Sequence, residues 1–271
     1  MSAMLHGLWN FLTKRVSGNL SVLYLGISCM CLLLLPAVLL RSPRSFIPPA
    51  YHFVIATGAI HALYFYFLSQ AYKHGNISTV YPVARGFGVI GTAIVAIASL
   101  GESISVAGLA GIISTGSGIF VVGTSVEKRS DDSRKGLWFA LLVGCTMVGY
   151  SIVDKLAMAR IDPVTYIFWL FLLSVILLTP YMLVARRHEL ATAWKERKRH
   201  GLTIGLGATA GYLLILFVFR IAQVSYVVAV REFSVVIGSL LGVIYLREAL
   251  SLRKLIGIVL VVTGLILIRI A

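Results

Sequence analysis

Charged residues are scarce in this chain. Of its 271 residues only 13% are charged and 59% are hydrophobic, and the mean hydropathy is +0.93. A soluble domain carries about 25% charged residues, so this composition excludes a soluble globular enzyme, a disordered chain and a nucleic-acid-binding module. Acidic residues are rarest: 10 Asp and Glu stand against 24 Lys and Arg, which gives a net charge of +14. In a membrane protein such an excess is typical of loops held in the cytoplasm.

Cysteine is also rare, and its three copies (Cys29, Cys31 and Cys145) all lie in apolar stretches. An odd number in such places excludes a disulfide framework, and the spacing is not that of zinc ligands. The apolar stretches hold no HExxH motif and no pair of catalytic aspartates, and the chain has no ATP-binding loop. We therefore expect no enzymatic activity, no metal and no cofactor.

Long apolar stretches dominate what is present. A bilayer core of about 30 Å needs about 20 apolar residues per helix, and charged, glycine-rich and proline-rich segments cut the chain into ten such stretches. The sequence therefore predicts an all-α integral membrane protein with ten transmembrane helices. The expected helices span residues 3–18, 20–40, 50–72, 76–99, 104–124, 136–158, 163–185, 202–221, 225–246 and 252–270.

The two halves of the sequence are similar to each other. When STVYPVARGFGVIGTAIVAIASLGE (78–102) is aligned with SYVVAVREFSVVIGSLLGVIYLRE (225–248), Arg85 meets Arg231 and Glu102 meets Glu248, each 17 residues further on. This is an internal repeat, and it divides the chain into 1–124, a polar linker at 125–135, and 136–271. Five helices per half is an odd number, so the second half enters the membrane from the opposite side. Inverted repeats of this kind recur in secondary transporters, with the substrate site at their interface.

The distribution of basic residues predicts an orientation. Loops after odd-numbered expected helices carry 16 Lys and Arg, against 6 on the other side. The positive-inside rule therefore places the odd-numbered loops in the cytoplasm and both termini outside.

Several segments resemble a known family. HGLWNFLTKR (6–15), AYKHGNISTVYPVARG (71–86), LGE (100–102) and VSYVVAVREFSVVIGSLLGVIYLRE (224–248) are similar in order, spacing and duplication to the drug/metabolite transporter superfamily. The resemblance is to its ten-helix members, which are built from two EamA-type halves, and it covers nearly the whole chain. It implies a multi-pass secondary carrier of the cell inner (plasma) membrane, commonly an exporter of amino acids or other metabolites. Members usually keep both termini in the cytoplasm, which departs from the charge count and leaves the orientation open.

Polar side chains within the apolar stretches are the candidates for function, because such groups are costly in a bilayer. Each has a plainer alternative: hydrogen bonding between helices, core packing, placement at the membrane interface, or capping of free carbonyls. For Arg85 and Arg231 the functional interpretation is attraction of a carboxylate or phosphate. The residues expected to contact substrate are Trp9, Asn10, His61, Tyr64, Tyr81, Arg85, Tyr150, Tyr212 and Arg231.

Acidic residues suggest two further roles. Asp154 and Glu232 are the candidates for a proton-titrating carboxylate, and the alternative for Asp154 is a salt bridge at the membrane surface. Glu102 and Glu248 are expected to stabilise the start of the helix that follows each of them. Pro82 is expected to interrupt its helix near Arg85.

The sequence thus predicts a secondary transporter of a small polar metabolite, anionic or zwitterionic, such as an amino acid. We expect it to export this substrate by alternating access between the inverted repeats. The alternatives are a non-transport membrane assembly subunit and a passive channel, because neither needs a sharp motif. The expected partners are a small-molecule substrate and the lipid bilayer, with no nucleic acid, and the pattern is compatible with a homodimer.

Overall fold

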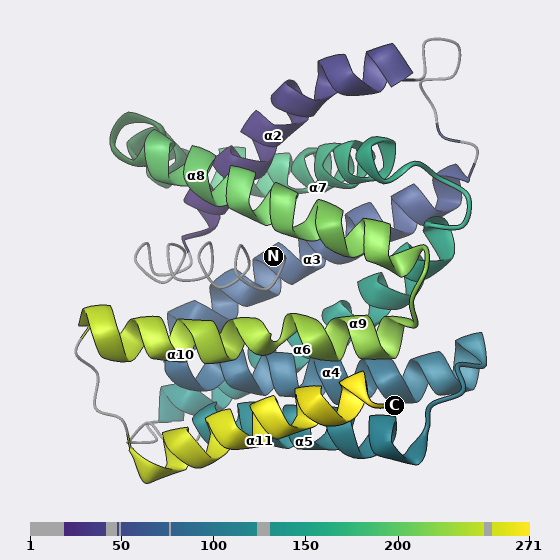
Figure 1. Cartoon of the computed structure of the whole chain (residues 1–271). Helices are drawn as coiled ribbons and strands as arrows, with labels where there is room; N and C mark the ends of the chain where they lie inside the picture. Colours follow the sequence, from purple (N-terminus) through teal and green to yellow (C-terminus); the bar gives the residue numbers. More distant parts are fainter. Residues whose placement is uncertain (1–18, 42–47, 49, 76, 124–130, 247–250) are drawn as a thin grey trace.

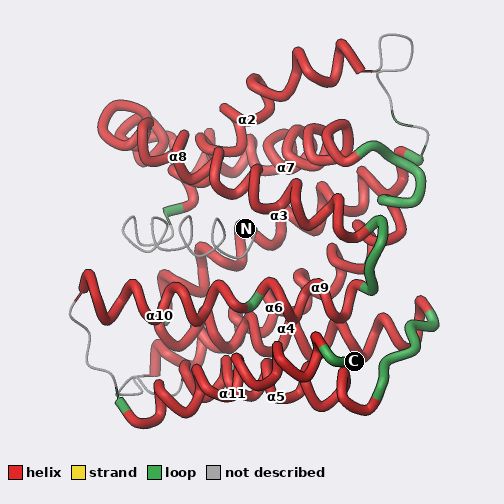
Figure 2. Tube along the Cα trace, viewed as in Figure 1, coloured by secondary structure: helices red, strands yellow, loops and turns green. Residues whose placement is uncertain are grey.

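Helices account for the regular structure of the part of the chain that can be described. The computed structural model describes residues 19–41, 48, 50–75, 77–123, 131–246 and 251–271, and this part contains no strand (Figures 1 and 2). The helices are α2 (Leu20–Arg41), α3 (Tyr51–His74), α4 (Ile77–Leu100), α5 (Val106–Gly123), α6 (Asp131–Ala157), α7 (Pro163–Ala185), α8 (Arg187–Phe219), α9 (Val224–Arg231), α10 (Phe233–Leu246) and α11 (Leu252–Arg269).

These bounds can be compared with the expected stretches. Within the described residues seven helices, α2 to α8, are long and apolar enough to cross a membrane. The expected helix at 225–246 is divided at Glu232 into α9 and α10, which have 8 and 14 residues. The expected helix at 3–18 lies outside the described residues.

Two connections differ from the expectation. Helix α6 begins at Asp131, so the end of the expected linker at 125–135 is helical, and acidic residues favour a helix N-terminus. The helix expected at 202–221 begins earlier, at Arg187, because the basic segment at 186–201 forms its first turns as part of α8. This helix has 33 residues and is about 50 Å long, so it exceeds the thickness of a bilayer core.

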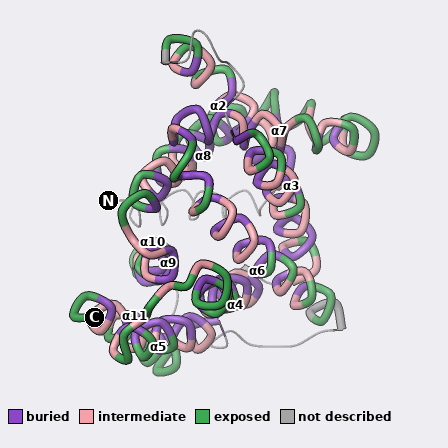
Figure 3. The backbone as a smooth tube through the Cα atoms, turned by 90° about the vertical axis from the view of Figure 1, so that its right-hand side faces the viewer, coloured by how far each residue is buried: buried purple, intermediate pink, exposed green. Residues whose placement is uncertain are grey.

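Neighbouring helices form a ring when the bundle is viewed from its end (Figure 3). Its order follows the contacts: α2 packs on α7, α7 on α3, α3 on α6, α6 on α4, α4 on α5, and α5 on α11, while α8 packs on α2. Successive spans run in opposite directions, so the connections after α4, α6 and α8 gather at one end of the bundle together with the C-terminus (Figure 2).

Glycines permit the closest helix contacts. A Cβ on Gly118 of α5 would lie 2.7 Å from the carbonyl oxygen of Gly257 on α11, and one on Gly26 of α2 would lie 2.7 Å from that of Gly201 on α8. Small residues drive association of helices in a bilayer because they let backbones approach. Both contacts join the N-terminal part of the chain to the C-terminal part.

The outward surface of the bundle is apolar. Leu40, Ile94 and Val106 are among many large hydrophobic side chains that remain exposed, at 83%, 61% and 87%. A soluble protein rarely exposes so much apolar surface. This surface is what contact with lipid requires.

Candidate functional site

A buried ion-pair cluster lies where α9 ends. Glu232 is fully buried, and its Oε2 atom lies 3.0 Å from Nε of Arg85, which projects from α4. Its other oxygen, Oε1, lies 3.5 Å from Nε of Arg231. The backbone of Glu232 is also the break between α9 and α10. One carboxylate therefore contacts two guanidinium groups, and the cluster keeps one surplus positive charge.

The cluster has unused hydrogen-bonding capacity. Among the described residues, Nε and Nη2 of Arg231 and Oε1 of Glu232 have no hydrogen-bond partner, although both side chains are buried. Buried polar atoms are normally satisfied, and Nε of Arg231 and Oε1 of Glu232 face each other as an ion pair without a hydrogen bond. A ligand that bonds to these two donors and this acceptor would replace that contact.

A second buried acid, Asp154, lies near the end of α6. Oδ1 accepts hydrogen bonds from the hydroxyls of Thr57 on α3, at 2.7 Å, and Tyr166 on α7, at 2.6 Å. Oδ2 accepts a third from the hydroxyl of Tyr212 on α8. The side chain is fully buried. Asp154 therefore joins four helices, and the salt bridge at the membrane surface, which the sequence left as an alternative, is not the arrangement observed.

Aromatic rings surround His61. Its Nδ1 atom lies 3.1 Å from Oγ1 of Thr57 and 3.0 Å from the carbonyl oxygen of the same residue. The ring stacks on Tyr150, with centroids 4.4 Å apart, and meets Tyr212 and Tyr64 edge-on. These rings give an amphipathic wall, apolar on the faces and polar at the hydroxyls.

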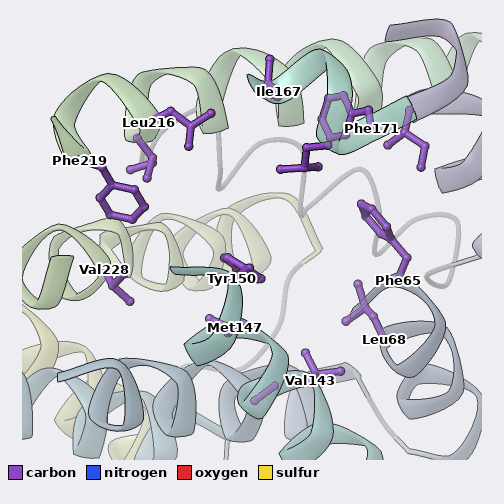
Figure 4. Close-up of a cluster of buried hydrophobic side chains, with 14 of the residues drawn as sticks. Phe65, Leu68, Val143, Met147, Tyr150, Ile167, Phe171, Leu216, Phe219 and Val228 are labelled. Atoms are coloured by element: carbon purple, nitrogen blue, oxygen red, sulfur yellow. The ribbon is translucent and has the colours of Figure 1, made fainter. Parts of the chain in front are cut away.

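Helix α6 connects the two clusters. Met147, Tyr150 and Asp154 occur at helical spacing on one face, and all three are buried. Met147 Sδ lies 4.0 Å from Nη1 of Arg85, while Tyr150 stacks on His61. Figure 4 shows Met147 and Tyr150 within a cluster of buried side chains that also includes Phe65 of α3 and Val228 of α9. The polar groups are thus set in an apolar interior, which strengthens their electrostatic interactions.

A cleft of about 580 Å³ opens at the end of the bundle where α4, α6 and α8 terminate. Glu102, Lys155, Arg160 and Arg220 are its charged lining residues. Lys155 Nζ donates to the carbonyl oxygens of Phe219, at 2.6 Å, and Ala222, at 2.8 Å. Lys155 therefore caps the C-terminal end of α8 and does not pair with its neighbour Asp154.

Glu102 does stabilise a helix terminus, but not the one expected. Its carboxylate accepts hydrogen bonds from the backbone N–H groups of Val224, at 2.6 Å, and Ser225, at 3.2 Å, and from the Ser225 hydroxyl, at 2.6 Å. It therefore caps α9 in the other half of the chain and not α5, which follows it. Glu248, the matching acid, lies outside the described residues.

Pro82 does not interrupt its helix. Helix α4 continues past it from Ile77 to Leu100. A proline removes only one backbone hydrogen bond, and the helix tolerates that loss within the bundle. The break in this region is instead at Glu232.

The structure brings most of the candidate residues together. Arg85, Arg231 and Glu232 form the ion-pair cluster, Tyr81 lies under the Arg85 guanidinium at 5.4 Å, and Asp154 forms the second cluster. His61, Tyr64, Tyr150 and Tyr212 form the aromatic wall. Trp9 and Asn10 lie outside the described residues.

Sequence reasoning missed Thr57 and Tyr166. Thr57 lies four residues before His61, so helical spacing could have placed it on the same face. Tyr166 offers no such signal, because only the packing of α7 against its neighbours directs its hydroxyl to Asp154.

Comparisons with known proteins agree with this architecture. The family model of the EamA-like transporter family matches residues 134–270, half of the chain. The chain therefore belongs to the EamA-like transporter family. A second model, that of the Small Multidrug Resistance protein, matches residues 22–114. A comparison with curated proteins finds no match.

A solved structure shares the fold. The crystal structure of another protein matches this chain with a TM-score of 0.78 at 15% sequence identity. The match covers 99% of this chain and 96% of that protein's chain. Together with the apolar helices, the family membership makes this chain a multi-pass membrane protein and a transporter, not an enzyme.

Proposed function

We propose that this chain is a secondary carrier that exports a small anionic or zwitterionic metabolite, such as an amino acid, across the cell inner membrane. Arg231 binds the carboxylate of the substrate, and Arg85 holds Glu232 in place beside it. His61, Tyr64, Tyr81, Tyr150 and Tyr212 line the substrate path. Trp9 and Asn10 remain candidates on the expected first helix.

The observation that carries this proposal is the unused capacity of the Arg231–Glu232 pair. Two donor atoms of a guanidinium group match the two oxygens of a carboxylate. The free acceptor Oε1 of Glu232 lies beside them and suits an ammonium group. A zwitterion presents both groups on adjacent atoms, so it satisfies the donors and the acceptor together.

The packing of the helices supports a pair of inverted five-helix repeats, 1–124 and 136–271, and hence alternating access. In such a repeat α2 corresponds to α7, α3 to α8 and α5 to α11. If the halves are exchanged, the contact between α2 and α8 becomes one between α7 and α3, and the contact between α5 and α11 becomes itself. All of these contacts are observed. Two family models matching the two halves separately also favour this division. Ten spans follow if residues 3–18 form the first and α9 with α10 the ninth.

Counterflow in proteoliposomes tests the proposal. Vesicles containing the purified protein are loaded with unlabelled amino acids and diluted into a mixture of radiolabelled amino acids. A carrier transiently concentrates at least one label and saturates with concentration, whereas a passive channel only equilibrates it. Absence of flux for every amino acid would contradict the substrate class.

Export is tested in cells. The medium of cells that overexpress the chain is profiled against that of cells carrying Arg231→Ala. Enrichment of an amino acid outside only with the intact chain supports export, and depletion from the medium would instead indicate import.

A further inference from the structure

The two buried acids have different surroundings. Glu232 contacts two guanidinium groups, at 3.0 Å and 3.5 Å, so its surroundings are ionic. Asp154 contacts three hydroxyls and, among the described residues, forms no ion pair. Hydroxyls can donate to a carboxylate and equally accept from a carboxylic acid. Asp154 is therefore the acid whose partners fit both protonation states.

A continuous hydrogen-bond chain leads from His61 to Asp154. The Nδ1 atom of His61 lies 3.0 Å from the carbonyl oxygen of Thr57, and a carbonyl can only accept, so Nδ1 carries the hydrogen. The same Nδ1 lies 3.1 Å from Oγ1 of Thr57, which donates to Oδ1 of Asp154 at 2.7 Å. In this tautomer Nε2 of His61 has a lone pair.

We propose that His61, Thr57 and Asp154 form a proton relay and that Asp154 binds the proton that drives transport. The proposal rests on the function proposed above, since it supplies the energy source for the same carrier. It resolves the choice between Asp154 and Glu232 in favour of Asp154.

The transfer balances in one concerted step. Nε2 of His61 accepts a proton, and Nδ1 gives its own proton to Oγ1 of Thr57. The Thr57 hydroxyl releases its original proton to Oδ1 of Asp154. After the step His61 is neutral, with its proton on Nε2. Thr57 is again a hydroxyl and now donates to Nδ1 of His61. Asp154 is a neutral acid that donates to the Thr57 hydroxyl. One proton enters and one negative charge disappears.

This loss of charge changes how α6 is held. Hydrogen bonds to an ionised acceptor are about twice as strong as neutral ones, so those from Tyr166 and Tyr212 weaken when Asp154 is protonated. These two hydroxyls tie α6 to α7 and α8. Proton binding therefore loosens α6 from that side of the ring while Met147 of α6 stays beside Arg85.

Other titratable and charged groups face this region from each element packed on α6. They are His61 on α3, Arg85 on α4, Tyr166 on α7, Tyr212 on α8, Arg231 on α9 with Glu232 after it, and Tyr150 on α6 itself. The two arginines and the two acids balance in charge when Asp154 is ionised. Binding of an anionic substrate at Arg231 adds a negative charge and thus favours a proton on Asp154, whereas a zwitterion with its ammonium group at Glu232 adds no net charge.

Infrared difference spectroscopy of the reconstituted protein tests the relay without any substrate. Lowering the pH is expected to produce the C=O stretch of a protonated, buried carboxyl group in the unaltered chain. This band should be absent in Asp154→Asn. It should persist in Asp162→Asn, a matched control, because Asp162 caps α7 and asparagine caps equally well. Persistence of the band in Asp154→Asn, or its absence from the unaltered chain, would overturn the proposal.

Two more variants test the path of the proton. Thr57→Val keeps the shape of the side chain but removes the hydroxyl, and His61→Ala removes the entry atom. After a pH jump both should reach the same band about tenfold more slowly or worse. If both variants reach the band at the same rate as the unaltered chain, the relay is contradicted.

A flux measurement then tests the coupling. With the radiolabelled amino-acid mixture, a pH gradient of one polarity should drive accumulation above equilibrium in the unaltered chain and in Asp162→Asn, but not in Asp154→Asn. Accumulation by Asp154→Asn would contradict the proposal. If the unaltered chain performs counterflow but does not respond to the pH gradient, the relay is contradicted and the proposed function is not. If the chain shows the infrared band but no counterflow, the proposed function is contradicted.

Discussion

At the scale of single residues, we expect the two donor atoms of the Arg231 guanidinium group to determine the affinity for substrate. Hydrogen bonds to a charged group contribute about 1.5–3 kcal/mol, which corresponds to a loss of about tenfold to a hundredfold in affinity. We expect Arg231→Ala to lose at least this much. Arg231→Lys should recover only part of it, because an ammonium group lacks the planar pair of donors. The concentration dependence of counterflow measures both.

Normal transport by Arg231→Ala, in protein that elutes as a single folded species, would show that this arginine is not a substrate contact. The control for expression is Arg187→Ala, a change in an exposed residue at the start of α8.

The Arg85–Glu232 pair is expected to stabilise the fold as well. Removing one partner of a buried ion pair costs about 3–5 kcal/mol, because the other charge is left uncompensated. Glu232→Gln should therefore lower the midpoint of thermal unfolding in detergent. The double variant Arg85→Gln/Glu232→Gln should be more stable than Glu232→Gln alone, because one of the two positive charges is also gone. Equal midpoints for the single and double variants would indicate that the pair does not act as a unit.

At the scale of elements, the start of α9 depends on Glu102. Loss of a side-chain cap costs about 0.5–2 kcal/mol, and Glu102 satisfies two backbone N–H groups of this helix. Glu102→Ala should lower the unfolding midpoint. Glu189→Ala, which removes an exposed acid paired with Arg186, should leave it nearly unchanged. A midpoint that is equal in both variants would contradict the cap.

Close contact between α5 and α11 depends on glycine. A Cβ on Gly118 would lie 2.7 Å from a backbone oxygen of α11, whereas one on Gly238 of α10 would meet no atom of the described residues within 4 Å. Gly118→Ala should lower the unfolding midpoint because the helices must separate. Gly238→Ala should raise it slightly, since alanine is favoured over glycine in helices by about 1 kcal/mol. The order of the two midpoints measures the contact.

Most helices were predictable from the sequence because each needs only an apolar run of sufficient length. The break at Glu232 was not, since the stretch 225–246 is apolar around Arg231 and Glu232, and one of the two arginines that contact this buried acid, Arg85, comes from α4. The contact between Glu102 and α9 was missed for a similar reason, because 122 residues separate the partners. The candidate site was found through polar side chains that are costly in lipid. This criterion does not distinguish Thr57 and Tyr166 from the many other hydroxyl-bearing residues of the apolar stretches.

At the scale of the whole molecule, the charge distribution predicts which end faces the cytoplasm. The connections after α4, α6 and α8 are poor in Lys and Arg, and with them lies the cleft lined by Gln223. In a variant without native cysteines, Gln223→Cys should react with a membrane-impermeant maleimide from outside intact cells. Trp194→Cys, in the basic part of α8, should react only after the cells are permeabilised. The reverse pattern would show that both termini are in the cytoplasm.

The ion-pair cluster also bears on how the chain is made. Arg85 enters the membrane early in synthesis, but its partner Glu232 is translated 147 residues later. Until then this contact cannot form, although a charged side chain inside a bilayer is costly. If the gene were split at the linker, the two halves would have to associate before Arg85 could meet Glu232. The contact that joins α4 to the break between α9 and α10 can therefore form only after the second half of the chain has entered the membrane.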